Sequence, residues 1–204
     1  MAKTKKDFQS EKSRAAILTA TMNLISKHGF NGTTADKIAA EAGLSKGSIF
    51  WHFENKENLF LAVIEEIRDG LLQTIMSGQE ELSSAGEKLS LLLDNYCSAT
   101  EVDCSRCLDL TVLIIEMVET NPELAGRLRD LFTEIADLLA DLLEAGKEQG
   151  EIGKSVDSPM TAYAIVGNLQ GMTVQHYLNR DKLQYRRLMK SYKDFLLPGL
   201  LRHE

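Results

Sequence analysis

The sequence has little proline and cysteine, few aromatic residues and no long apolar run. Its 204 residues include three prolines and three cysteines, and aromatic residues make up 6%. Three cysteines, an odd number, do not make a disulfide framework and fit a reducing compartment. Because proline is scarce while alanine, leucine, glutamate and lysine are common, the composition favours helices over many short strands. We therefore expect an all-α fold.

No segment resembles a membrane span or a secretory signal. No window approaches the run of about 20 apolar residues that a membrane span needs, and the opening MAKTKKDFQSEKSR lacks an apolar core. Apolar residues make up 44% and charged residues 26% of the chain, as in ordinary globular proteins. The sequence therefore predicts a cytoplasmic protein of one or two domains with no membrane partner.

The charge is distributed unevenly along the chain. The formal net charge is -7, but residues 1–60 carry nine Lys and Arg against six Asp and Glu, a net charge of +3. The other 144 residues carry 14 basic and 24 acidic side chains, a net charge of -10. A chain polarised in this way can present its basic end to a polyanion while its acidic part remains soluble.

Prolines and caps mark the expected helix boundaries. Asn121-Pro122-Glu123 and Ser158-Pro159 each place an N-cap residue before a proline at the first helical position, and Pro198 is expected to close the last apolar run. The first helix is expected to stop at Gly29. Nine helices and no strand are predicted, over about 10–28, 34–42, 45–52, 55–77, 86–100, 106–119, 122–148, 158–179 and 183–197. Residues 77–86 and 150–155 are expected to be loops.

Residues 35–52 have the steric pattern of a helix-turn-helix. The first helix has small inner residues where a second helix must cross closely, and Gly43 supplies the turn. The positions expected to face inward are Ile38, Ala39, Ala42, Leu44, Ile49 and, at the end of the second helix, Phe53. Thr33 with Asp36 can cap the first of these helices, and Ser45 can cap the second.

The second of these helices begins with a small, polar and basic turn, Ser45-Lys46-Gly47-Ser48. Unpaired N–H groups and the positive end of the helix dipole suit a phosphate there, and Lys46 adds a positive charge. Gly47 has no side chain to keep the backbone away from a groove edge. A helical hairpin with no ligand is the alternative.

This segment and its flanks resemble the DNA-binding signature of the TetR (AcrR) family of bacterial transcriptional regulators. The resemblance runs through Thr33–Phe53 and Asn55-Lys56-Glu57-Asn58-Leu59, follows a first helix ending in His28-Gly29-Phe30, and covers about residues 12–62. Beyond residue 62 it extends only to the number and length of the helices and the helix start Asn121-Pro122-Glu123-Leu124. The resemblance implies a three-helix DNA-binding domain over 1–54 and a helical effector-binding and dimerisation domain over 55–204. The basic residues of 1–9 form either an arm that adds phosphate or minor-groove contacts or a solubilising tail.

The resemblance also implies which residues contact DNA. They are Thr33, Thr34, Ser45, Lys46, Gly47, Ser48, Phe50, Trp51, His52 and Lys56. The family often has tyrosine where this chain has Phe50, so a phenolic contact to phosphate is not available there. Trp51 can still donate through its indole N–H and His52 through its imidazole. Packing for Trp51 and solvation for His52 and Lys56 remain alternatives.

The remaining helices are expected to bind a small apolar or amphipathic effector. The candidate pocket residues, where polar groups interrupt apolar stripes, are Leu92, Tyr96, Cys107, Thr111, Glu116, Met117, Leu138, Asn168, Met172 and His176. Ordinary core packing is the alternative for most of them. A buried Glu116 would suit a cationic ligand, and outward solvation is its alternative.

The last two helices supply two apolar faces for a homodimer. Gly167 and Gly171, four residues apart, allow two helices to approach closely, although packing within one chain explains them equally well. The candidate interface residues are Ile165, Gly167, Gly171, Val174, Leu188, Tyr192 and Phe195.

The sequence predicts a ligand-responsive regulator, a repressor released from a palindromic double-stranded DNA operator when the effector binds. A helical protein-interaction module is one alternative, and a redox-responsive or metal-responsive regulator using Cys104 and Cys107 is another. Catalysis is not expected, because the four histidines form no HExxH or similar pair. No metal site and no cofactor are predicted.

Overall fold

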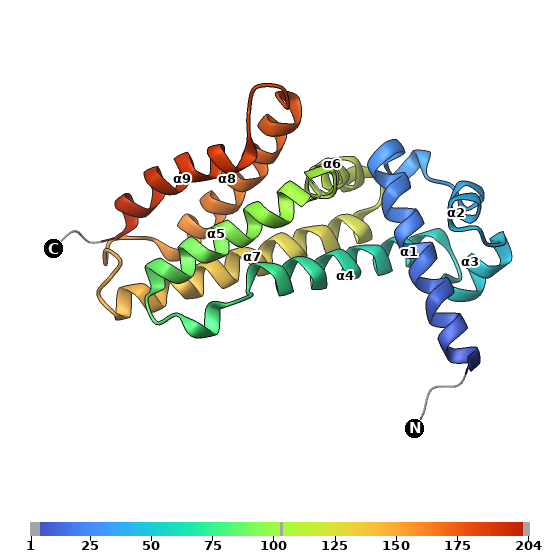
Figure 1. Cartoon of the computed structure of the whole chain (residues 1–204), viewed down its shortest axis with the longest axis horizontal. Helices are drawn as coiled ribbons and strands as arrows, with labels where there is room; N and C mark the ends of the chain where they lie inside the picture. Colours follow the sequence, from blue (N-terminus) through green and yellow to red (C-terminus); the bar gives the residue numbers. More distant parts are fainter. Residues whose placement is uncertain (1–4, 103, 202–204) are drawn as a thin grey trace. The chain divides into compact units, whose positions relative to one another are not determined.

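The computed structural model describes the backbone of residues 5–102 and 104–201, and their side chains except those of 5, 6, 101, 102, 104–109, 111 and 112. Within this part of the chain there are nine α-helices, one short 3-10 helix and no strand beyond an isolated bridge between Ile152 and Leu201 (Figure 1). The helices are α1 (Lys5–Gly32), α2 (Ala35–Ala42), α3 (Lys46–Phe53), α4 (Lys56–Ile75), η1 (Gln79–Glu81), α5 (Ala85–Val102), α6 (Cys104–Thr120), α7 (Pro122–Glu148), α8 (Ser158–Leu178) and α9 (Tyr185–Leu200). The all-α prediction is confirmed.

The chain folds as two compact units. The first comprises Met1–Ile67 and Val112–Leu128, and the second Arg68–Thr111 and Arg129–Glu204. Helices α4, α6 and α7 each contribute residues to both units, because the division falls within all three of them. A domain boundary at residues 54 and 55 stays a proposal, since the first unit also includes the start of α4 and residues from α6 and α7.

The first unit is built around α1, α2 and α3. Of the side chains predicted to face inward, those of Ile38, Ala39, Ile49 and Phe53 are buried, whereas those of Ala42 and Leu44 are partly buried. Further core residues come from α1 and α4: Ile17, Leu18, Leu24, Ile25, Leu59, Phe60 and Val63. Gly43 ends α2 in the left-handed conformation, with φ 65°, and its N–H donates to Ala39 and Ala40. The predicted helix-turn-helix is therefore present.

The second unit has its core between α5, α7, α8 and α9. Its most deeply buried side chains include Leu89, Leu92, Leu93, Leu139, Leu143, Ile165, Tyr185 and Met189. Arg68 of α4 binds Glu134 of α7 through two hydrogen bonds of 2.7 Å, a paired geometry that fixes both side chains. Glu151 accepts hydrogen bonds from Ser84 Oγ (2.8 Å) and the N–H of Gly86 (3.1 Å), which satisfies donors at the start of α5.

Two predicted helix ends were wrong. Helix α1 does not stop at Gly29 but breaks there, with φ 65° and ψ -175°, and resumes to Gly32. Helix α9 does not stop at Pro198 but continues to Leu200. A proline this close to a helix end removes only one late hydrogen bond. The turn is held because Leu201 N donates to Leu197 O (2.9 Å), and Gly153 N donates to Leu200 O (3.2 Å).

Two predicted caps were shifted by one residue. Asp157, not Ser158, caps α8 by accepting a hydrogen bond from Met160 N. Ser158 instead donates to Glu144. The cap of α2 is Thr34 rather than Thr33, because Thr34 Oγ1 accepts the hydrogen bond from Lys37 N.

Two other predicted caps are confirmed, and one predicted loop is partly helical. The Ser45 side chain caps α3, and Asn121 Oδ1 accepts from Leu124 N at 3.2 Å. The expected loop over 77–86 includes the short helix η1.

We expect Gly146→Ala to destabilise the second unit. An added Cβ would lie 2.6 Å from Ile152 Cδ1 and 2.8 Å from Ala85 Cβ, so α7 or its neighbours would have to shift. Such overpacking costs about 1–3 kcal/mol. The measurement is urea unfolding at a fixed protein concentration.

Gly70→Ala is the matched control, because Gly70 is exposed in α4 and no heavy atom lies within 4 Å of the new Cβ. It should stabilise the chain by up to about 1 kcal/mol through helix propensity. Equal shifts for the two variants would contradict the close packing at Gly146.

Candidate DNA interface and effector-binding residues

The start of α3 is fixed by a serine cap. Ser45 has extended backbone angles, and its Oγ accepts a hydrogen bond from Ser48 N at 3.1 Å. The two serine hydroxyls lie 2.9 Å apart. The cap satisfies one donor of the first turn, and the other N–H groups there are available to an anion.

An open groove runs beside this helix start. It is lined by Gln9, Ser10, Ser13, Ser45, Gly47, Ser48, Trp51 and His52. Five of the ten predicted DNA contacts therefore line one surface. The three contributions from α1 were missed by sequence reasoning. Gln9, Ser10 and Ser13 occupy positions i, i+1 and i+4 of α1 and so form a polar face, one turn before the buried Ile17. That face is the feature of the sequence from which they could have been found.

Trp51 is the most exposed aromatic side chain of this groove. It is 70% exposed, and its ring meets the His52 ring edge-on at 4.6 Å between centroids. Phe50 is also exposed, at 41%.

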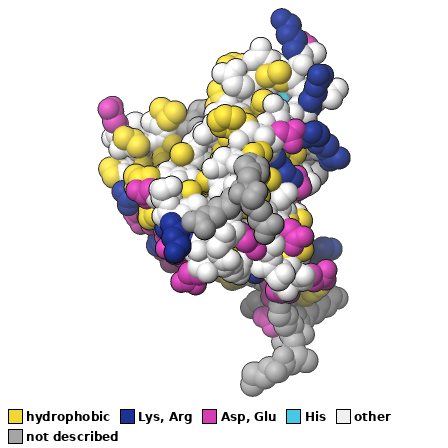
Figure 2. Space-filling model, turned by 90° about the vertical axis from the view of Figure 1, so that its left-hand side faces the viewer, with side chains coloured by type: hydrophobic (Ala, Val, Ile, Leu, Met, Phe, Trp, Pro, Cys, Tyr) yellow, Lys and Arg dark blue, Asp and Glu magenta, His cyan; other side chains and the backbone are white. Residues whose placement is uncertain are grey.

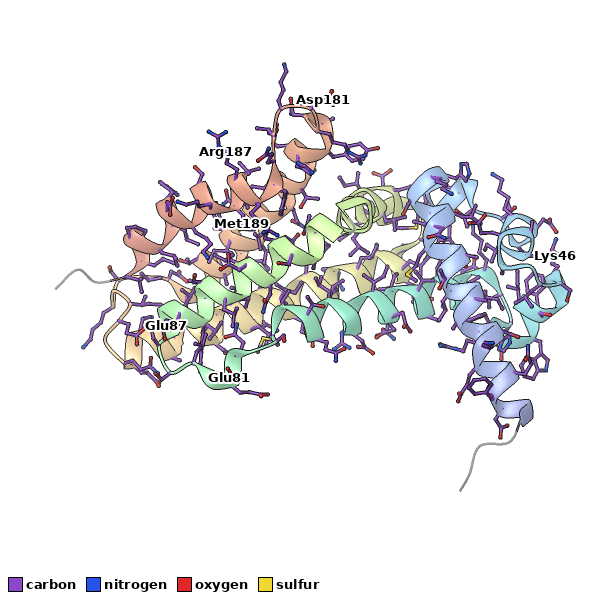
Figure 3. The ribbon with its side chains drawn as sticks, viewed as in Figure 1. Lys46, Glu81, Glu87, Asp181, Arg187 and Met189 are labelled. Carbon is purple, nitrogen blue, oxygen red and sulfur yellow. The ribbon has the colours of Figure 1, made fainter. Side chains whose placement is uncertain are left out.

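Lys46 lies at the outer side of α2 and α3 (Figure 3). Its amine is 3.0 Å from Asp36 Oδ2 of α2, and both side chains are largely exposed. Exposed ion pairs of this kind contribute only about 0–1 kcal/mol, so a phosphate can replace Asp36 as the partner of the amine.

His52 is held in its neutral form. Burial lowers the pKa of the imidazole below 6.5, and the positive charge of Arg14 lowers it further. At neutral pH the ring therefore presents one N–H donor and one acceptor rather than a positive charge.

Two predicted DNA contacts are engaged inside the first unit. Thr33 is buried, and its hydroxyl donates to Gly29 O at 2.7 Å. The amine of Lys56 donates to Phe30 O at 2.8 Å and lies 4.0 Å from the centre of the Phe30 ring. Burial lowers the pKa of Lys56, opposed by the charges of Glu57 and Glu116. Thr34, by contrast, is exposed and caps α2 through its bond from Lys37 N.

The predicted pocket residues do not form one group. In the second unit Leu92 and Tyr96 are buried, and Leu138 is partly buried. In the first unit Met117 is buried, and Glu116 accepts a hydrogen bond from Asn31 in the last turn of α1. The side chains of Cys107 and Thr111 lie outside the described residues.

The three predicted pocket residues of α8 lie away from that interior. Asn168 and Met172 line an open groove on α8 and α9. His176 Nδ1 lies at hydrogen-bond distance, 2.7 Å, from Leu183 O. This contact joins α8 to the segment that connects it with α9.

Three of the seven predicted dimer residues, Gly167, Gly171 and Leu188, line that open groove. It is lined by Ala164, Gly167, Asn168, Gly171, Met172, Gln175, Leu183 and Leu188. No heavy atom of the chain lies within 4 Å of a Cβ built on Gly167 or Gly171, so a second helix has room there. Figure 2 shows hydrophobic side chains exposed among charged ones on the side that carries the C-terminus.

The other predicted dimer residues differ in exposure. Phe195 is 79% exposed, whereas Ile165 is 1% exposed and lies inside its own chain. Val174 is partly buried. Tyr192 is also partly buried, and its burial raises the pKa of its hydroxyl to about 12. Ile165 is therefore left out of the interface proposed below.

The described residues contain no group of three or more His, Cys, Asp and Glu side chains that could hold a metal ion. The side chains of Cys104 and Cys107, on which the redox and metal alternatives rest, lie outside them. Within the same part of the chain, no helix combines the length and the apolar character needed to cross a bilayer.

The sequence matches two family models. Residues 17–63 match bacterial regulatory proteins of the tetR family, and residues 85–192 match the tetracyclin repressor-like, C-terminal domain. The second match spans more than half of the chain.

Named relatives agree with these matches. The fatty acid metabolism regulator protein of Bacillus subtilis is 24% identical over 184 residues, 90% of this chain and 93% of the relative. The HTH-type transcriptional regulator RutR of Escherichia coli K12 is 31% identical over 140 residues, 66% of this chain and 63% of the relative. The crystal structure of FadR from Bacillus subtilis in complex with stearoyl-CoA shares the fold, with a TM-score of 0.80 at 24% identity over 91% of this chain and 98% of that chain.

We expect the His52 imidazole to titrate below pH 6.5 in the folded chain, as followed by the NMR shifts of its ring protons. Because the unfolded chain takes up this proton first, the stabilising contribution is present above pH 6.5 and is lost as the pH falls through the lowered pKa. Arg14→Gln should raise the pKa, since it removes a positive charge. A pKa at or above 6.5 in the unmodified protein would contradict this description.

Proposed function

Because this chain belongs to the TetR family of bacterial regulatory proteins, we propose that it is a transcriptional repressor that leaves its operator when a small amphipathic molecule binds. The observation that carries the proposal is the open groove at the start of α3, with its serine cap, its exposed tryptophan and its neutral histidine. The named relatives are transcriptional regulators, which favours this role over catalysis.

DNA recognition requires two copies of α3. In a two-fold dimer, two recognition helices reach successive major-groove faces when they lie about 34–36 Å apart, which makes the operator a palindrome. The α8 and α9 groove around Gly167 and Gly171 supports a dimer of this kind, with Leu188 and Phe195 continuing the apolar face. Backbone N–H groups at the start of α3 and Lys46 hold phosphates, and side chains of the groove reach the bases.

The effector is proposed to be a long-chain acyl-CoA. The support is the fatty acid metabolism regulator of Bacillus subtilis, whose solved structure holds stearoyl-CoA. An acyl chain suits the apolar interior of the second unit, where Leu92 and Tyr96 are buried. Effector and DNA then weaken each other by the same factor, because coupling between two binding sites is reciprocal.

We expect Lys46→Ala to weaken binding to every DNA sequence and to reduce the salt dependence by about one phosphate contact per subunit. Asp36→Asn should do the opposite, because it frees the Lys46 amine from its present partner. The measurement is fluorescence anisotropy with a duplex that the protein selects from a random library, titrated at several salt concentrations. If Lys46→Ala left both affinity and salt slope unchanged, Lys46 would be removed from the contacts.

Stearoyl-CoA should lower the affinity of the unmodified protein for that duplex by about 5–150-fold, the usual range of coupling between sites. Free coenzyme A and stearate are the controls, because each supplies only half of the amphipathic molecule. Unchanged affinity with stearoyl-CoA would reject the proposed effector class and leave the DNA-binding role standing.

A further inference from the structure

Glu116 of α6 makes an unusual set of contacts with the last turn of α1, which follows the break at Gly29. Its Oε1 accepts a hydrogen bond from Asn31 Nδ2 at 2.7 Å and lies 3.4 Å from Asn31 N, while its Oε2 lies 3.4 Å from Phe30 N. These contacts join residues 85 and 86 positions apart in the chain. Three donors thus converge on one carboxylate, which sequence reasoning assigned to a ligand pocket or to solvent.

The turn itself is shaped to receive this carboxylate. Gly29 has φ 65° and ψ -175°, a region of backbone space open essentially to glycine alone. A Cβ built on Gly29 would lie 3.2 Å from Glu116 Oε2, so the missing side chain is also what allows the close approach. The charge of Lys56, whose amine holds Phe30 O, lies near enough to interact with Glu116.

The turn leads directly into α2. The buried Thr33 donates through Oγ1 to Gly29 O and through its N–H to Phe30 O, and Lys37 Nζ donates to Gly32 O at 2.8 Å. The position of the turn therefore fixes the position of Thr34, the cap of α2. Helix α2 in turn contacts α3, and Ile38 of α2 and Ile49 of α3 are both buried.

Helix α6 extends from Cys104 in the second compact unit to Thr120 in the first. We infer that Glu116 is the positioning residue through which α6 holds the DNA-reading helices, so that a displacement of α6 changes the orientation of α2 and α3. This inference rests on the proposed function for its link to an effector. The anchor itself is a property of the first unit alone.

The first experiment needs neither DNA nor effector. Amide hydrogen exchange of Phe30 and Asn31 is compared in the unmodified protein, in Glu116→Ala and in Glu119→Gln, an exposed position on the same helix that serves as the matched control. We expect exchange at these two amides to become about tenfold faster in Glu116→Ala, the size of losing a hydrogen bond to a charged group. Unchanged exchange would overturn the anchor.

A second readout follows the DNA-reading helices. Trp51 on α3 is the only tryptophan of the chain, so its fluorescence anisotropy decay reports local motion at that helix and at no other site. Glu116→Ala should increase the amplitude of this motion and lower DNA affinity about tenfold relative to Glu119→Gln, a size typical of coupling between sites. Equal motion and equal affinity in the two variants would show a contact with no positioning role.

Rescue separates positioning from a general loss of structure. Asn31→Asp sets two carboxylates against each other and should weaken DNA binding at least as much as Glu116→Ala. In the double variant Asn31→Asp with Glu116→Gln, the amide introduced at position 116 donates to the carboxylate introduced at position 31 and still accepts from the backbone, so most of the affinity should return. No recovery in a double variant that melts at the same temperature as the unmodified protein would overturn the inference.

Stearoyl-CoA is the probe that tests whether Glu116 couples effector binding to DNA binding. It should reduce DNA affinity less in Glu116→Ala than in the unmodified protein, because a loosened anchor no longer transmits the motion of α6. If stearoyl-CoA does not change the DNA affinity of the unmodified protein, the proposed effector class is rejected. The exchange, anisotropy and rescue results still decide the role of Glu116. If it responds and the variant responds equally, the role of Glu116 in coupling is rejected.

Discussion

The structure depends on how an eight-residue helix, α3, is kept in place. Isolated helices shorter than about 12–15 residues are marginal in water, so α3 exists only through its cap and its packing. Ser45 satisfies the first turn, and the buried Ile49 and Phe53 join α3 to the core of the first unit. Since these inward contacts supply the stability, the outward residues, including the exposed Trp51, are left free to bind.

Local features were predictable from the sequence, and long-range ones were not. The cap at Ser45 and the left-handed turn at Gly43 follow from residue types next to one another. The helix that continues through Pro198 depends on a bond from the distant Gly153. Glu116 was assigned to a pocket or to solvent because its partners lie 85 residues earlier, where periodicity carries no information. The α1 residues that line the groove fall between these cases, since their polar face is visible in the sequence but the groove that they line is not.

Charge in this protein is arranged to keep DNA binding conditional. The whole chain is acidic, with a net charge of -7, so nonspecific attraction to DNA is weak away from the N-terminal helices. Within them Lys46 has an acidic partner, and Lys56 is committed to a carbonyl and an aromatic ring. In the DNA complex proposed above, affinity therefore depends more on helix N–H groups and on groove side chains than on a large excess of positive charge. Such an interface is sensitive to the orientation of its helices, because dipoles and hydrogen bonds are directional whereas simple charges are not.

That sensitivity explains why a modest anchor is enough. Coupling between two binding sites is typically about 1–3 kcal/mol, and a hydrogen bond to a charged group contributes about 1.5–3 kcal/mol. The Glu116 contacts, one short and two near 3.4 Å, fall within that range rather than far above it. A much stronger connection would hold α2 against any displacement that ligand binding could cause, and a weaker one would let the turn move independently of α6. In the coupling proposed above, a partly exposed carboxylate beside a glycine break has a strength that suits a reversible switch.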